Sequence, residues 1–114
     1  MENWRELKAM VKALAGVTRL AIIYHLSRDE KISVSDLSIT LGISQPLVSW
    51  HLRKLRRAGL IETRREGRQV YCIFNQQRFR SCLQRLEGLI DPSVQSMPPV
   101  GAALIEAEAE REDS

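Results

Sequence analysis

Residues 34–60, VSDLSITLGISQPLVSWHLRKLRRAGL, decide the fold that we predict for this chain. The first part predicts a helix over Val34–Leu41, because Ser33 can cap its N-terminus and Asp36 stands three residues further on. Gly42 is expected to end this helix, since glycine readily adopts the positive φ of a tight turn. A second helical pattern follows at once, so the stretch predicts two helices joined by a short turn.

The second helix is predicted to begin after Ser44, a good N-cap, and to end near Gly59. One face is apolar at helical spacing and is expected to be buried, through Val48, Leu52 and Leu55. The opposite face has small polar residues near its start and arginines near its end, which suits a helix that contacts base edges and phosphates. The DNA-binding residues predicted here are Ser44, Gln45, Pro46, Ser49, Trp50, Arg53, Lys54 and Arg57.

An ordinary helical hairpin in a globular core would show the same apolar spacing, so charge has to separate the two interpretations. Between Gln45 and Ala58 there are four basic residues and no acidic one. Residues 53–85 hold ten basic residues against two acidic ones, whereas residues 106–113 hold five acids and one arginine. A basic middle of this kind is typical of a nucleic-acid-binding protein, although a solvated arginine surface is the alternative.

Two runs rich in β-branched and aromatic residues follow, at 60–65 and 69–74, with Gly67 in the turn between them. The pattern predicts a β-hairpin. A hairpin directly after a recognition helix is a wing, and its arginines can reach phosphates or a narrow minor groove. The predicted wing contacts are Arg64, Arg65 and Arg68. The alternative is an exposed hairpin that its charges keep soluble.

Helices are predicted on both sides of this motif. Residues 3–15 and 76–90 are amphipathic, and residues 18–27 are apolar around most of the helix, which favours a central place in the core. A hairpin cannot bury the apolar stripe of the last helix, so the first and last helices are candidates for a two-fold dimer interface. The predicted interface residues are Trp4, Leu7, Val11, Phe79, Leu83, Leu86 and Ile90.

The length and composition of the chain fit one small domain. A chain of 114 residues that is 44% hydrophobic can form a core. We expect a mainly α winged helix-turn-helix fold with a small β-hairpin, in which residues 1–90 bind DNA and dimerise. Residues 91–114 are expected to form a Pro/Ser-rich linker and an acidic tail, with helix formers at 102–111.

The location expected for the chain is the cytoplasm. No apolar run approaches a membrane span, and the N-terminal MENWRELKAM is too charged for a signal peptide. The two cysteines fit a reducing compartment better than a disulfide framework. We therefore expect no membrane partner.

Several strings together resemble the ArsR-type (arsenic-repressor-like) winged-helix transcriptional regulators. They are S-Q-x-x-V-S-x-H-L from Ser44, L-R-x-A-G-L from Leu55 and R-x-G-R-x-V-Y from Arg65, with Thr18-Arg19-Leu20 and Ser35-Asp36-Leu37 before them. The likeness spans about residues 7–88. It implies a homodimeric repressor that binds operator DNA with the helix over residues 45–57. Dimerisation would supply two such helices, which suits a double-stranded, pseudo-palindromic site.

The resemblance also exposes a departure. Many such relatives sense metals through a cysteine pair just before and inside the first helix of the motif, where this chain has Ser33 and Ser35. Hydroxyls are poor ligands for the soft metal ions that select thiolates. Other relatives use acid and histidine pairs on the last helix, but residues 76–88 contain no histidine and a single acid, Glu87. We therefore expect no metal site and no cofactor.

Two alternatives remain beside a DNA-binding repressor. Cys72 and Cys82 could make the protein thiol-responsive, although buried cysteines more often serve as small hydrophobic residues. A winged-helix protein-interaction module would share the core but should lack a continuous basic face. An enzyme is not expected, because the sequence shows no nucleophile–base pair, metal cluster or phosphate loop.

Overall fold

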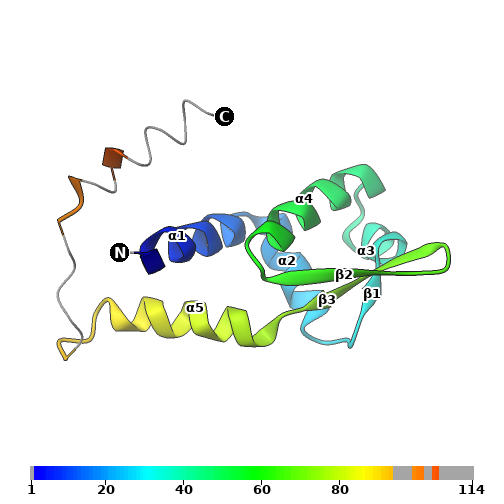
Figure 1. Ribbon diagram of the computed structural model, residues 1–114. Coiled ribbons are helices and arrows are strands. Elements are labelled where there is room, and N and C mark those ends of the chain that lie inside the picture. Colours follow the sequence, from blue (N-terminus) through cyan, green and yellow to red (C-terminus); the bar gives the residue numbers. More distant parts are fainter. Residues whose placement is uncertain (1, 94–98, 102–103, 106–114) are drawn as a thin grey trace.

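The computed structural model of the chain describes residues 2–93, 99–101 and 104–105, with side chains from Trp4 onward. The elements are α1 Glu2–Leu14, α2 Val17–Leu26, β1 Ile32–Ser33, α3 Val34–Leu41, α4 Gln45–Arg57, β2 Ile61–Glu66, β3 Gln69–Phe74 and α5 Gln76–Gly88. This order confirms the predicted winged helix-turn-helix, with a hairpin after the recognition helix (Figure 1). The helix predicted over 102–111 falls largely outside the described residues.

Local signals in the helix pair act as the sequence predicts. The hydroxyl of Ser33 accepts a hydrogen bond from the Asp36 amide at 3.1 Å and so caps α3. Gly42 ends that helix with φ 68°. The hydroxyl of Ser44 then accepts from the Leu47 amide at 3.3 Å and caps α4. The caps and the glycine together fix the turn that sets the angle between α3 and α4.

The three strands form one antiparallel sheet in the order β1-β3-β2. In the hairpin, Ile61 pairs with Phe74 and Glu66 with Gln69, and the turn between them has Gly67 at φ 63°. The short strand β1 adds to the other edge of β3, where Ile32 pairs with Cys72. The middle of β3 is therefore joined to the start of α3.

The core lies where α1, α2, α3 and α4 meet the base of the sheet. The fully buried residues include Ile22 and Leu26 from α2, Leu37 from α3, and Val48 and Leu55 from α4. The prediction that α2 lies in the middle of the core is correct only for the face that carries Ile22 and Leu26. On its other side the helix is open, with Val17 87%, Leu20 54% and Tyr24 52% exposed, because none of the described elements covers that face.

No single helix among the described residues is long and apolar enough to cross a membrane. One pair of helices reaches the length and apolar composition of a membrane span only when the two are added together. They are Trp4–Leu14 and Val17–Leu26, which meet at an angle of 94°.

Candidate nucleic-acid interface

The α4 helix presents one polar face to the outside. Its apolar stripe, Val48, Leu52 and Leu55, is buried, which fixes the rotation of the helix about its axis. The opposite side is exposed and carries Gln45, Pro46, Ser49, Arg53 and Arg57. The structure therefore brings together the residues that the sequence predicts for DNA contact, small polar side chains at the N-terminal end and cations at the C-terminal end.

Trp50 lies at the centre of a cationic cluster on the α2 side of α4. Its side chain is 42% exposed, a large value for tryptophan. The guanidinium carbon of Arg19 lies 5.6 Å and the ammonium of Lys54 lies 5.2 Å from the centroid of the indole ring. Cations at these distances are attracted to the negative face of the ring. The ring therefore holds two positive charges close to the exposed side of α4.

His51, the next residue, connects α4 to α2. Arg19 donates from Nε to the Nδ1 atom of His51 at 3.3 Å and from Nη1 to the carbonyl of Ala13 at 3.3 Å. Burial lowers the pKa of His51, and the positive charge of Arg19 lowers it further. A neutral imidazole whose Nδ1 accepts is the form that this contact requires.

The wing arginines do not all lie on the same face. Successive side chains of a strand point to opposite faces, so Arg65 shares a face with Thr63 while Arg64 lies on the other. Thr63 accepts a hydrogen bond from Arg56 of α4 at 3.3 Å, which places the face of Arg65 beside the recognition helix. Arg64 instead forms a 3.3 Å ion pair with Glu62 on its own strand.

Arg68 is exposed in the tip of the hairpin, directly after Gly67. Arg65 and Arg68 are thus exposed, with Arg65 on the face of the wing that lies beside α4, whereas Arg64 is paired with a carboxylate.

The predicted dimer residues divide between the surface and the core. Leu7, predicted in the interface, is only 6% exposed and belongs to the core of the protomer, so it offers little side-chain surface to a second copy. Trp4 and Phe79 are half-buried against the same core. An exposed apolar stripe does remain on α1 and α5 and just beyond, formed by Val11 (40% exposed), Leu83 (46%), Leu86 (36%) and Ile90 (86%).

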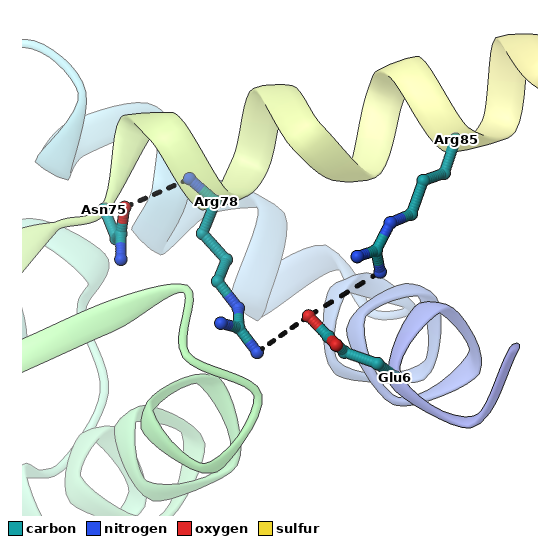
Figure 2. A network of polar contacts seen from close by, with 4 residues as sticks. All are labelled: Glu6, Asn75, Arg78 and Arg85. Carbon is teal, nitrogen blue, oxygen red and sulfur yellow. Dashed lines mark hydrogen bonds and ion pairs between the residues drawn. The ribbon is translucent and has the colours of Figure 1, made fainter. Parts of the chain in front are cut away.

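Ion pairs hold α5 against α1. Figure 2 shows Glu6 of α1 between Arg78 and Arg85 of α5, at 3.0 and 3.6 Å. The side chain of Asn75 caps α5 by accepting from the amide of Arg78 at 3.0 Å. The first and last helices therefore pack side by side as a unit.

Both thiols are inside the protein. Cys72 is fully buried, and Cys82 is 1% exposed. Burial raises the pKa of Cys72 to about 11 and also raises that of Cys82. A reactive thiol needs access to solvent and a lowered pKa, and neither cysteine has these properties.

Ser33 and Ser35 have structural roles. Ser33 is 4% exposed and caps α3, and its hydroxyl lies 3.2 Å from that of Ser35. Ser35 also contacts Gln69 of the wing at 3.2 Å. Within the described ranges, no group of three or more histidine, cysteine or acidic residues is placed to hold a metal ion.

The sequence pattern did not assign Lys12 and Arg19 to the basic face around α4. They lie beside Trp50 and Lys54 although they come from α1 and α2. The feature of the sequence that could have identified Arg19 is its position as an isolated cation on a helix that is otherwise almost wholly apolar. Such a residue needs a polar partner or solvent at that point.

Comparisons with known proteins agree with this architecture. A model of bacterial regulatory proteins of the arsR family matches residues 16–63. The arsenic resistance transcriptional regulator ArsR1 of Pseudomonas putida is 32% identical over 95 residues, 83% of this chain and 74% of that protein. The transcriptional activator HlyU of Vibrio cholerae is 34% identical over 88 residues, 77% of this chain and 81% of that protein.

Solved structures give the same result. HlyU of Vibrio cholerae superposes with a TM-score of 0.62 at 34% identity, covering 74% of this chain and 94% of that one. A homodimeric winged helix-turn-helix DNA-binding domain of Mycobacterium bovis superposes with a TM-score of 0.66 at 25% identity, covering 75% and 80%. The chain therefore belongs to the arsR family of bacterial regulatory proteins and is a transcriptional regulator of the DNA-binding winged helix-turn-helix class.

Proposed function

We propose that this protein is a homodimeric repressor that binds a pseudo-palindromic operator in the bacterial cytoplasm and catalyses no reaction. The observation that carries the proposal is the outer face of α4. Its polar and cationic side chains are exposed, while the caps and the buried stripe on the other side hold the helix in one orientation. A helix of this kind fits the major groove of B-DNA.

Gln45 and Ser49 are proposed to contact base edges. Both are exposed, and Gln45 is the first residue of α4, the end that enters the groove in helix-turn-helix proteins. A glutamine amide can both donate to and accept from adenine, which gives sequence preference. The proposed backbone contacts are Ser44, Pro46, Trp50, Arg53, Lys54 and Arg57 of the motif and Arg64, Arg65 and Arg68 of the wing, with Arg64 having to leave Glu62.

Dimerisation is proposed through the exposed stripe on α1 and α5. Val11, Leu83, Leu86 and Ile90 are apolar and exposed in the single chain, and a second copy related by a two-fold axis would cover them. The Mycobacterium bovis relative, described as homodimeric, supports this arrangement. Residues 1–90 would then form the binding and dimerisation domain, and residues 91–114 the linker and acidic tail.

The structure gives less support to the alternative functions. A thiol-responsive repressor would need an accessible thiolate, whereas burial raises the pKa of both cysteines. A protein-interaction module would not need an exposed basic helix, and Arg53 and Arg57 remain exposed on α4.

Selection of bound duplexes from a random pool tests the proposal. The expected site has two symmetric half-sites about one helical turn apart. Gln45→Ala should relax the preference at one position of each half-site, and Arg53→Ala should weaken binding to all sequences alike. Gln84→Ala and Arg28→Gln, which change exposed side chains outside α4, are the matched controls. Equal affinity of the wild-type protein for the selected site and for random duplex would refute sequence-specific binding.

A further inference from the structure

A groove lies between α1, the start of α2 and the C-terminal half of α4, on the side of α4 away from the wing. Four cations and one aromatic side chain line it, namely Lys12, Arg19, Lys54, Arg57 and Trp50. The other lining residues are alanines, and none of them is acidic. These small side chains let a ligand come close to the backbone of α1 and of the C-terminal end of α4. The groove is therefore shaped for a compact anion.

The positive charge in this groove is not compensated within the described part of the chain. The ion pairs there join Lys31 to Glu66, Arg64 to Glu62, and Arg78 and Arg85 to Glu6, so they lie outside the groove. Arg19 contacts two neutral acceptors, His51 and the Ala13 carbonyl, through Nε and Nη1. Its Nη2 donors have no hydrogen-bond partner among the described residues.

The position of the groove complements that of the wing. Arg56 contacts Thr63 of β2, so the wing lies along one flank of α4. Trp50 and Lys54 lie on the other flank, next to Arg19 of α2. A helix in the major groove has a phosphate backbone on each side. The two flanks of α4 therefore face the two strands. On the flank away from the wing, the backbone contacts proposed above come from α4 alone, through Trp50 and Lys54.

We propose that this groove binds one backbone phosphate of the DNA strand opposite the wing, with Lys12 and Arg19 as its principal ligands. Guanidinium and ammonium groups form short, charge-assisted hydrogen bonds with phosphate oxygens. Trp50 holds Arg19 and Lys54 in place through its ring face, and the bond from Arg19 to His51 fixes the guanidinium against α4. The helices α1 and α2 thus contribute to DNA binding. The proposal rests on the function proposed above.

The test replaces operator phosphates one at a time by neutral methylphosphonates and compares wild type with Lys12→Gln/Arg19→Gln. Wild type should lose affinity by at least about tenfold at one phosphate per half-site, on the strand that the wing does not contact. The double variant should be insensitive to that replacement and keep the other sensitive positions. The slope of log affinity against log salt should also be smaller by about 0.9 per protomer.

Control variants separate a direct contact from a change in the fold. Arg28→Gln removes an arginine that also lies over an aromatic ring, Tyr24 at 3.6 Å, but outside the groove, and it should bind like wild type. Lys12→Gln alone leaves the bonds of Arg19 intact and should lower the salt slope in the same direction. An unchanged set of sensitive phosphates in the double variant would overturn the groove proposal even if the operator is bound specifically. If the protein shows no operator preference, the salt slope on random duplex still tests the groove, and an unchanged slope there would refute it.

Discussion

Replacing Gly59 with alanine should destabilise the protein more than the same replacement at Gly42, and Arg78 is the reason. Gly59 follows α4 with φ 78°, and Gly42 follows α3 with φ 68°. Both lie in the left-handed region, where a β-carbon costs roughly 1–2 kcal/mol. A β-carbon at Gly42 would meet no atom within 4 Å, whereas one at Gly59 would lie 2.8 Å from Nε of Arg78.

The size of the difference follows from what Arg78 must give up. The arginine side chain is flexible and can move away, but this breaks its 3.0 Å ion pair with Glu6 (Figure 2). A partly exposed ion pair contributes roughly 0.2–1 kcal/mol to stability. We therefore expect Gly42→Ala to cost about 1–2 kcal/mol, and Gly59→Ala to cost up to about 1 kcal/mol more than that.

Urea unfolding followed by circular dichroism measures these costs, with all proteins at one protomer concentration because dimerisation changes apparent stability. The decisive comparison is Gly59→Ala in the wild-type and in the Arg78→Ala background. Without the Arg78 side chain, the alanine at position 59 should cost only its backbone strain, as Gly42→Ala does. An equal cost of Gly59→Ala in both backgrounds would show that Arg78 does not constrain this turn.

Further predictions concern the core, the capping of α4 and two titratable groups. Leu55→Ala should lower the free energy of unfolding by about 2–5 kcal/mol because Leu55 is fully buried, whereas Ile39→Ala, at a site 79% exposed, should change it by less than about 0.5 kcal/mol in urea titrations. Ser44→Ala should cost about 0.5–2 kcal/mol through the lost cap, and an unchanged midpoint would contradict that role. Because the pKa of His51 is lowered in the folded protein, the unfolded chain binds a proton first as the pH falls below about 6.5. Stability should therefore decrease between pH 6.5 and 5 in wild type more than in His51→Gln, measured by thermal unfolding. With its pKa raised to about 11, Cys72 should react with a thiol reagent at pH 8 only when urea unfolds the chain, and rapid labelling of the folded protein would contradict its burial.

The sequence determined the order of the elements and their ends. Ser33, Gly42 and Ser44 mark helix ends through hydrogen bonds and backbone angles that involve residues at most a few positions away. A short stretch of sequence therefore contains every residue that forms such a cap or turn. The buried stripe of α4 was equally readable, because its spacing of three and four residues has one structural meaning for a helix in a core.

The tertiary structure decided which amphipathic residues the protomer itself covers. Leu7 and Val11 are four residues apart on one helix, and spacing alone assigns both to one stripe. The packing of α1 against its neighbours buries Leu7 and leaves Val11 40% exposed. On α5, Cys82 is likewise buried while Leu83 is exposed. A wide apolar stripe has an inner and an outer part, and only the position of the neighbouring helices separates them.

The basic groove beside α4 is also a product of the tertiary structure. Arg19 and His51 are 32 residues apart, and their contact depends on how α2 crosses α4. The sequence by itself determined a basic recognition helix followed by a wing, since each is encoded within a short continuous stretch. Only the folded chain brings Lys12 and Arg19 to the flank of that helix, because packing between distant segments, and no local pattern, sets which charges become neighbours.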